Sequence, residues 1–334
     1  MKEALTRQIF SESVAKGEIS LPAVPGMIDE YVARCAAVFA GVGREFSDEE
    51  IDQLRVLLED QLAQAYSSSQ RSSIVISYNA PSAQPLNYHV HANWWTPEAD
   101  YENWISTREP PLFGTEPDAR VWALASEADV PAMHRILDIG AGTGRNALAL
   151  ARRGHPVDVV ELTPKFADMI RVEAQRESLD VRVIVRDIFA TNDDLRRDYQ
   201  LIVLSGVVPD FRTTRQLRAL FELGALCLAP GARMVFNVFL ACGGYTPDEA
   251  AREFGHQTHS AIFTRHEVAT AAAGLPFKLV ADDSVYDYEK AHLPDGAWPP
   301  TKWYANWVRG LNVFTIEREI SPIELRWLVF NKTR

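Results

Sequence analysis

The sequence predicts an α/β fold built on a mostly parallel sheet, and three observations support this fold class. Short apolar runs alternate with helical patterns from Arg135 onward, which is typical of a sheet with helices on both faces. The run Ile136–Ile139 passes directly into three alternating glycines. A helical pattern starts where these glycines end. A strand, a glycine turn and a helix in this order are typical of nucleotide-binding units.

The remaining elements of this region follow from apolar runs bounded by glycine, proline and capping residues. Helices are expected at about 146–153, 164–177 and 214–227, and behind the Thr264–Glu267 capping box. The expected strands are 136–139, 157–161, 181–185, 199–204, 232–239, 277–281 and 324–330.

Residues 1–115 differ in pattern and predict a helical and aromatic N-terminal cap. Residues 1–66 are expected to be helical, partly because Ser47 and Glu50 form a capping box. Two short strands are expected at 74–78 and 86–91. Residues 116–334 form the expected second domain, with a lid insertion at about 284–322 that is too long for an ordinary hairpin loop.

The three glycines, Gly140, Gly142 and Gly144, allow positive φ and let a ligand lie against bare backbone. A dinucleotide fingerprint G-x-G-x-x-G would need glycine at position 145, where this chain has Arg145. The observed spacing is D-x-G-x-G-x-G, led by Asp138. This spacing disfavours a nicotinamide-dependent enzyme.

This stretch resembles motif I of the class I S-adenosylmethionine (SAM) methyltransferases. Residues 142–146 and 154–159 look most like the branch of tellurite-resistance-type and related small-molecule methyltransferases. The resemblance covers about residues 130–281 and the last strand. It implies a Rossmann-like, seven-stranded, mostly parallel sheet with an antiparallel last strand, SAM as cofactor, and methyl-transfer activity of class EC 2.1.1. Carboxylates suit SAM, which carries an amino group and a sulfonium.

Acids that follow successive strands complete the expected cofactor site. Glu161 ends the second strand, where two acceptor oxygens can bridge a ribose diol. The resemblance places Asp187 at the adenine amino group and the Ser205 loop beside the transferred methyl. The expected cofactor-binding residues are Asp138, Gly140, Gly142, Gly144, Asn146, Glu161, Leu162, Asp187, Ile188, Phe189 and Ser205.

The loop after the fourth strand departs from one branch of the resembling family. Residues 205–211 lack the Asn- or Asp-Pro-Pro-aromatic motif of enzymes that methylate amides or exocyclic base amines. Asp210 is either a general base or a turn carboxylate beside Pro209. It does not by itself supply the clustered acids of metal-dependent catechol methylation, so no metal is expected.

Aromatic residues flank the expected cofactor domain on both sides, and six of the eight tryptophans lie there. Methyl transfer is an in-line displacement that depends on alignment in a dry pocket, so aromatic acceptor walls are expected. A hydrophobic core that joins the cap to the sheet is the alternative. The expected acceptor residues are Tyr88, Trp94, Trp95, Tyr288, Trp303 and Tyr304.

A histidine base would suit deprotonation of a phenol or an amine at neutral pH. The candidates are His89, His91, His256 and His259. His89 and His91 alternate along one predicted strand, but no third residue at zinc-ligand spacing accompanies them.

The net charge of −11 disfavours nucleic acid or an anionic membrane as partner. Three scattered cysteines, and an N-terminus without a secretory signal pattern, predict a cytoplasmic protein. We therefore expect SAM-dependent methyl transfer to a small molecule, at oxygen or nitrogen. The alternatives are a methyltransferase that acts on macromolecules, and a SAM-binding protein that is non-catalytic or regulatory.

Overall fold

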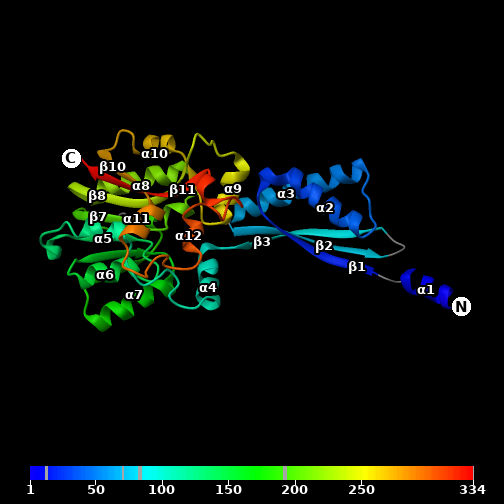
Figure 1. The fold of residues 1–334 in the computed structure, drawn as a ribbon, viewed down its shortest axis with the longest axis horizontal. Coiled ribbons are helices and arrows are strands. Elements are labelled where there is room, and N and C mark those ends of the chain that lie inside the picture. Colours follow the sequence, from blue (N-terminus) through cyan, green and yellow to red (C-terminus); the bar gives the residue numbers. More distant parts are fainter. Residues whose placement is uncertain (12–13, 70, 82–84, 191–193, 334) are drawn as a thin grey trace. The chain divides into compact units, whose positions relative to one another are not determined.

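The structure is a computed structural model that describes residues 1–334 except 12–13, 70, 82–84, 191–193 and 334 (Figure 1). The chain forms two compact units. The first comprises residues 1–100 and 248–257, and the second comprises residues 101–247 and 258–334. The chain thus leaves the first unit near residue 100, whereas the sequence suggested about 115, and it later returns for ten residues.

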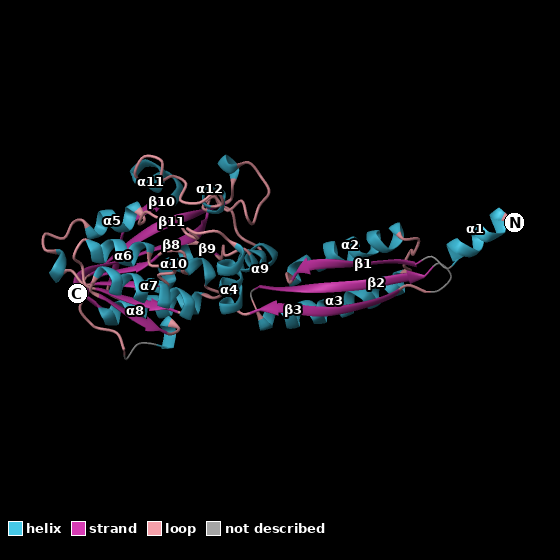
Figure 2. Ribbon diagram, turned by 90° about the horizontal axis from the view of Figure 1, so that it is seen from below, coloured by secondary structure: helices cyan, strands magenta, loops and turns pink. Residues whose placement is uncertain are grey.

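The first unit packs helices against a three-stranded antiparallel sheet (Figure 2). The sheet has the order β1-β2-β3. Phe39, Leu54, Leu58 and Leu62 are fully buried beneath it. The elements are α1 (Lys2–Ser11), β1 (Val14–Pro22), α2 (Ile28–Gly41), α3 (Asp48–Ser68), β2 (Arg71–Pro81), β3 (Asn87–Trp95) and α9 (Glu249–Gln257).

The prediction that residues 1–66 are all helical is wrong for β1. This strand pairs with β2 in a register that runs from Val14 opposite Pro81 to Pro22 opposite Ser73. Ile19 is buried in the core, while Glu18 and Ser20 are exposed. This alternation of buried and exposed residues is typical of a half-buried strand. The partner of β1 lies more than 50 residues away, so no local capping signal marks it.

The second unit is built on a sheet whose eight described strands follow the order β10-β11-β8-β7-β4-β5-β6, with β9 beside β8. β11 is antiparallel to β8 and to β10, and the other described pairings are parallel. This arrangement confirms the predicted Rossmann-like fold class. The strands are β4 (Ile136–Ile139), β5 (Val157–Glu161), β6 (Val181–Val185), β7 (Tyr199–Leu204), β8 (Leu228–Ala241), β9 (Ile262–Phe263), β10 (Phe277–Ser284) and β11 (Ile323–Lys332).

Helices cover this sheet, with α6 and α7 on the opposite side from α8 and α10 (Figure 1). Phe221 of α8 packs edge-on against Phe236 and Phe330 of the sheet, at ring centroid distances of 5.9 and 4.9 Å. None of the described helices is long and apolar enough to cross a membrane. The helices are α4 (Pro97–Thr107), α5 (Ala119–Ala125), α6 (Arg145–Arg152), α7 (Pro164–Glu177), α8 (Thr214–Cys227), α10 (Arg265–Ala272), α11 (Val285–His292) and α12 (Tyr304–Trp307).

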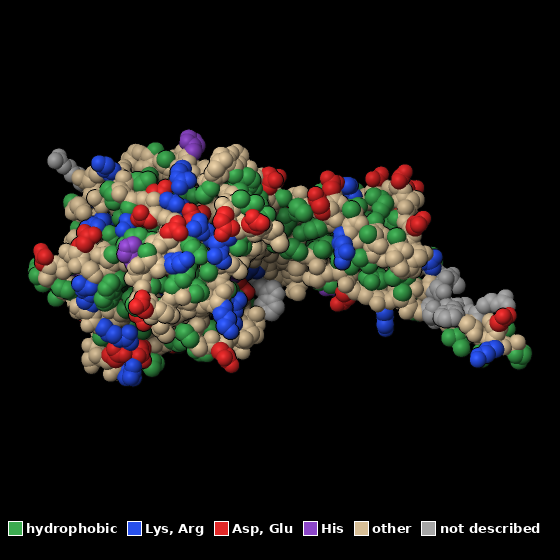
Figure 3. Space-filling view, in the orientation of Figure 1, with side chains coloured by type: hydrophobic (Ala, Val, Ile, Leu, Met, Phe, Trp, Pro, Cys, Tyr) green, Lys and Arg blue, Asp and Glu red, His purple; other side chains and the backbone are tan. Residues whose placement is uncertain are grey.

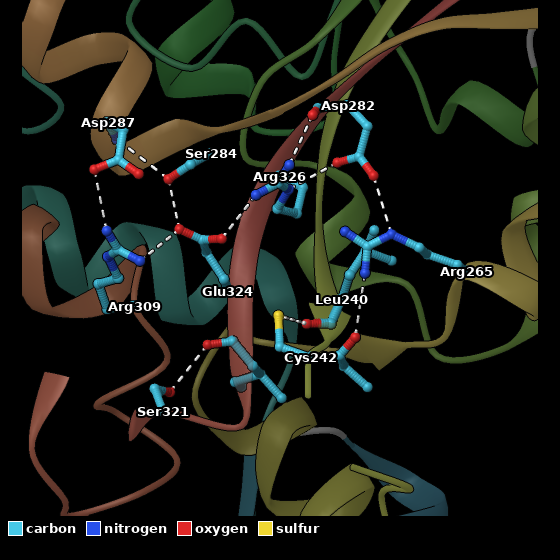
Figure 4. Close-up of polar contacts among 12 residues, drawn as sticks. Leu240, Cys242, Arg265, Asp282, Ser284, Asp287, Arg309, Ser321, Glu324 and Arg326 are labelled. Atoms are coloured by element: carbon cyan, nitrogen blue, oxygen red, sulfur yellow. Dashed lines mark hydrogen bonds and ion pairs between the residues drawn. The ribbon is translucent and has the colours of Figure 1, made fainter. Parts of the chain in front are cut away.

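The long segment between β10 and β11 is fixed to the sheet edge by a network of charged side chains (Figure 4). Arg309 donates a hydrogen bond to Glu324 at 2.7 Å and pairs with Asp287 at 3.2 Å. Glu324 also pairs with Arg326 at 2.9 Å, and Arg326 donates to Asp282 at 2.7 Å. The Arg309–Glu324 pair therefore joins the insertion to β11, and the Arg326–Asp282 pair joins β11 to β10.

Candidate functional site

The glycine loop between β4 and α6 has the conformation that its sequence predicts. Gly140, Gly142 and Gly144 have φ of +65°, +55° and +85°, where a side chain adds strain. A Cβ on Gly140 would lie 2.4 Å from Cγ2 of Val207, and one on Gly142 would lie 3.2 Å from Cε2 of Phe113. The backbone angle therefore favours glycine at all three positions, and the available space is most restrictive at Gly140.

Glu161, at the end of β5, is 5% exposed and supports this loop. One carboxylate oxygen accepts the Gly142 N–H at 2.8 Å, and the other accepts the Thr163 N–H at 2.8 Å. Burial raises the pKa of Glu161, and these amide hydrogen bonds oppose that rise. The Thr163 side chain and the Leu162 N–H also hydrogen-bond this carboxylate, so a ligand hydroxyl would bind it by sharing an acceptor oxygen with these donors. Leu162, beside it, is 39% exposed and offers an apolar surface.

Asp138 lies beneath the loop and is 1% exposed. Its Oδ2 atom has no hydrogen-bond donor among the described residues. Burial, and next the charge of Asp118, raise the pKa of Asp138 to about 8. A buried carboxyl oxygen without a donor is unfavourable, and an ammonium group placed nearby would remove that cost. The residues present therefore fit a ligand with an amino group and a diol, as SAM has.

Asp118 connects three parts of the site, although no motif in the sequence marks it. It is 1% exposed. Its carboxylate accepts from Arg145 at 2.7 Å, from the Asn146 amide at 2.9 Å and from the Ser205 hydroxyl at 2.7 Å. Asn146 and Ser205, expected as cofactor ligands, are thus bonded to Asp118 and fix the loops around the glycines. The only feature of the sequence that could have drawn attention to Asp118 is its position just before a helical pattern.

The insertion contributes two further buried groups near Asp118. Glu289 accepts hydrogen bonds from the Ala119 N–H at 2.7 Å and from Nε1 of Trp327 at 2.9 Å. Burial, followed by the charge of Asp118, raises the pKa of Glu289 to about 7. The same two causes raise the pKa of Tyr304 well above its ordinary value. Tyr304 is therefore close to the charged groups that border the glycine loop.

The residues expected around adenine follow β6. Asp187 is exposed, and its Oδ1 accepts the Phe189 N–H at 2.9 Å, which closes a tight turn. Ile188 is buried, and the ring of Phe189 lies 5.4 Å from that of Phe211. This turn presents an exposed carboxylate beside apolar side chains.

A set of rings in the second unit, which we call the aromatic cluster, borders the glycine loop. Its members are Tyr101, Trp104, Phe113, Phe166, His259 and Trp303. The Trp104 ring lies 6.2 Å from Phe113, 6.2 Å from Trp303 and 5.3 Å from His259. Phe113 is also the ring closest to Gly142. The structure thus brings Trp104 and Trp303, from opposite flanks of the sheet region in the sequence, to one place.

Within this cluster His259 and Asp210 form a hydrogen-bonded pair. Nδ1 of His259 lies 3.0 Å from Oδ1 of Asp210, and the Tyr101 hydroxyl donates to Oδ2 at 2.9 Å. His259 has a φ of +52°, which is strained for a residue with a side chain. Its carbonyl accepts a hydrogen bond from Nε1 of Trp307 at 2.9 Å. The imidazole is therefore held by several contacts.

The other candidate histidines belong to the first unit. His89 and His91 lie on β3 with exposed, stacked rings whose centroids are 5.9 Å apart. No group of three or more His, Cys, Asp or Glu in the described parts of the chain is arranged to hold a metal ion. Nδ1 of His256 lies 2.8 Å from the Tyr66 hydroxyl.

The remaining expected acceptor residues are divided between the units. Tyr88 and Trp94 lie on β3 of the first unit, and Trp94 is 55% exposed. The side chain of Trp95 lies outside the described residues. Tyr288, in the second unit, stacks on His292 at 4.2 Å. Of the histidine and acceptor candidates, His259, Trp303 and Tyr304 are those that lie in the second unit with the aromatic cluster or the charged groups beside the glycine loop.

Comparison with known proteins agrees with this geometry. Residues 136–231 match a family model described as a methyltransferase domain. This segment contains the glycine loop, Glu161, Asp187 and Ser205. A sequence comparison with curated proteins gave no match. The match agrees with the methyltransferase domain predicted for this part of the chain. The closer likeness to tellurite-resistance-type enzymes stays a prediction.

Two solved structures share the fold at low sequence identity. One is a proposed sarcosine dimethylglycine methyltransferase from Galdieria sulphuraria, with 17% identity and a TM-score of 0.50 over 71% of this chain and 98% of that one. The other is a geranyl diphosphate methyltransferase in complex with SAM, with 16% identity and a TM-score of 0.50 over 64% of this chain and 85% of that one.

Proposed function

We propose that this chain is a SAM-dependent methyltransferase that acts on a small molecule, at an oxygen or nitrogen atom. The observation that carries this proposal is the glycine loop with its two acids. Bare backbone, the carboxylate of Glu161 beside the loop and the unpaired Oδ2 of Asp138 match a diol and an ammonium group. When bound, SAM supplies a methyl group on a positively charged sulfur, which an acceptor atom displaces in line.

The chain's own residues supply binding and orientation for this reaction. Glu161 holds the ribose and the loop together, Asp138 neutralises the amino group, and Phe113 covers the loop at Gly142. Alignment of this kind accounts for much of the rate of a two-substrate reaction.

Two observations favour a small acceptor over a macromolecule. On the face shown in Figure 3, Lys and Arg side chains are interspersed with Asp and Glu, and the net charge is −11. Proteins that grip nucleic acids usually gather positive charge on one face. The similar structures are named for geranyl diphosphate and sarcosine, which are small molecules.

Two experiments test this proposal. Calorimetry is expected to show binding of SAM and S-adenosylhomocysteine (SAH) and none of NAD. Incubation with methyl-labelled SAM and a cell extract is then expected to label a compound of low molecular mass. Label on protein or nucleic acid would favour the macromolecular alternative, and cofactor binding without any labelled product would favour a non-catalytic protein. NAD binding without SAM binding would contradict the proposal.

Glu161→Gln is expected to weaken SAH binding by about 10- to 100-fold, because hydrogen bonds to a charged group contribute about 1.5–3 kcal/mol. The substitution also replaces one carboxylate oxygen by an NH₂ group. This donor would face the N–H of Gly142 or Thr163, each of which now donates to Glu161. Glu222→Gln is the matched control, since Glu222 pairs with Arg218 on the surface of α8. Calorimetry measures the SAH affinity of both variants. If Glu161→Gln bound SAH as tightly as Glu222→Gln, Glu161 would not belong to the cofactor site.

Cofactor binding is expected to depend on pH through Asp138, whose pKa is about 8. Below that value the carboxyl is protonated, and a bound ammonium group favours its ionised form. SAH binding should then release a proton and tighten by up to roughly tenfold per pH unit between about pH 6 and about pH 8. Calorimetry in buffers of different ionisation enthalpy measures this. Asp138→Asn should bind weakly, with a much shallower pH dependence.

The stability of the ligand-free protein should change in the opposite sense. The folded-state pKa of Asp138 is raised, so its contribution to stability is complete at acidic pH and is lost as the pH rises through about 8. Asp138→Asn should therefore lose less stability than the wild type as the pH rises from about 4 to about 8. Identical pH profiles of the melting temperature would show that Asp138 does not titrate in this range.

A further inference from the structure

We propose that His259, oriented by Asp210, takes the proton of the methyl acceptor, and that this acceptor is a phenol. This inference rests on the proposed methyltransferase function and specifies its acceptor side.

The contacts of His259 define which ring nitrogen can accept a proton. Nδ1 faces a carboxylate oxygen of Asp210 at 3.0 Å, so Nδ1 carries the hydrogen and donates it. The neutral ring then has its basic lone pair on Nε2. The second oxygen of Asp210 accepts from the Tyr101 hydroxyl, which restrains the carboxylate beside His259. A carboxylate in this position also stabilises the imidazolium that forms on proton uptake.

The pair lies next to the glycine loop. Asp210 ends the short turn Val208–Asp210 that follows β7, and its N–H donates to the Val207 carbonyl at 3.0 Å. Val207 is the residue whose side chain fills the space above Gly140. The carboxylate is therefore one turn from the first cofactor glycine, on the loop that follows the fourth strand of the parallel sheet. Ligands of such sheets bind at this carboxyl edge.

The backbone of His259 has a conformation that is unfavourable for a residue with a side chain. Its φ of +52° has a cost of about 1–3 kcal/mol for a residue other than glycine. The Trp307 indole bond to its carbonyl and the Asp210 bond to its ring maintain it. Strain of this kind concentrates at functional sites, and it gives the imidazole one fixed direction.

The aromatic side chains around the His259–Asp210 pair indicate which class of acceptor would bind there. Trp104 and Tyr101 lie 5.3 and 6.1 Å from the His259 ring, and Trp303 lies 6.2 Å from Trp104. These rings are only partly buried. The Arg108 guanidinium lies 3.6 Å from the centre of the Trp104 ring, so a planar molecule would stack on the ring surfaces that Arg108 leaves exposed. A phenolic hydroxyl has a pKa of about 10 and is mostly protonated near neutral pH. It therefore needs a base, and a neutral imidazole is one of suitable strength.

The step balances without a further reactant. Nε2 of His259 takes the phenolic proton as the phenol oxygen forms a bond to the methyl carbon of SAM. The carbon–sulfur bond breaks, its electron pair stays on sulfur, and SAH and an aryl methyl ether result. The imidazolium then returns its proton to water.

The test compares two phenols of similar shape and different acidity, 4-methylphenol and 4-nitrophenol, with methyl-labelled SAM. At about pH 8 the first is protonated and the second is largely ionised, because the nitro group lowers its pKa well below the value of about 10 for a simple phenol. His259→Asn is expected to lower the rate on 4-methylphenol by about 100-fold or more, the usual contribution of a general base. Its rate on 4-nitrophenol should fall less than tenfold.

A second measurement reads the hydrogen position directly. Long-range proton–nitrogen correlation spectra of the SAH complex, assigned with His259→Asn, should show the His259 hydrogen on Nδ1 in the wild type. In Asp210→Asn it should shift toward Nε2, while SAH affinity stays within about twofold, a change under 0.5 kcal/mol. Asp210 is thus a positioning residue.

Each outcome has a separate meaning. If the wild type fails to bind SAH, the proposed function itself fails. If it binds SAH but methylates neither phenol, the acceptor class is wrong. If His259→Asn slows both phenols equally, or if the wild-type hydrogen lies on Nε2, then His259 is not the base.

Discussion

Replacement of Gly140 by alanine is expected to abolish measurable SAH binding and to lower stability by about 2–5 kcal/mol. The left-handed backbone contributes about 1–2 kcal/mol of this, since φ is +65°. Overpacking contributes about 1–3 kcal/mol, since the new Cβ would lie 2.4 Å from Cγ2 of Val207. Relief of the clash requires Val207 or the loop to move, and both line the cofactor site. Urea unfolding and SAH calorimetry measure the two effects.

Gly231→Ala is the matched control for this substitution. Gly231 has a φ of +79°, but a Cβ there would meet nothing within 4 Å. It should therefore lose only the strain of about 1–2 kcal/mol and keep its SAH affinity. The double variant Gly140→Ala with Val207→Ala should recover part of the lost stability. If Gly140→Ala alone bound SAH like the wild type, the ligand would not lie on this loop.

The second large effect is expected at Asp118. Asp118→Ala should destabilise the protein by about 3–5 kcal/mol, the usual result of removing one partner from a buried ion pair. The Arg145 side chain is 11% exposed and would lose its carboxylate, and Asn146 and Ser205 would lose an acceptor. SAH affinity should fall as well, since these residues lie on both sides of the glycine loop. Asp118→Asn should be less damaging because it keeps the volume and one acceptor.

The control for Asp118 is Asp198→Ala. Asp198 pairs with Arg135 at 2.9 Å, but its side chain is 61% exposed. Exposed pairs of this kind contribute about 0–1 kcal/mol. Urea unfolding of Asp118→Ala, Asp118→Asn and Asp198→Ala measures their free energies of unfolding for this comparison. If Asp118→Ala were as mild as Asp198→Ala, the buried network around Asp118 would have no structural importance.

Much of the second unit follows from its sequence. The strands 157–161, 181–185 and 199–204 and the helix 164–177 were expected with the bounds that the structure shows. Each is an apolar or amphipathic run with glycine, proline or a capping residue at its ends, so its limits are set locally. β1 was missed because its stability comes from pairing with β2, far away in the chain, and not from its own residues.

The site residues also differ in whether their role depends on local sequence or on distant partners. The glycines and Glu161 were found because their spacing along the chain is what places them together. Asp118 gave no such signal, since its role depends on Arg145 and Ser205, 27 and 87 residues away. His259 was one of four histidine candidates from sequence, and with His256 it was the alternative to His89 and His91. The structure distinguishes it through Asp210, which is 49 residues away.

The return of residues 248–257 to the first unit limits how this protein can be divided. Glu253 of this segment accepts the Gly26 N–H at 2.8 Å, and Gln257 donates to the Ala23 carbonyl at 3.1 Å. Glu253 and His256 are both buried. A fragment that begins at residue 101 would expose these groups and leave them without their partners. Domain swaps or truncations therefore need to replace or remove α9 together with residues 1–100.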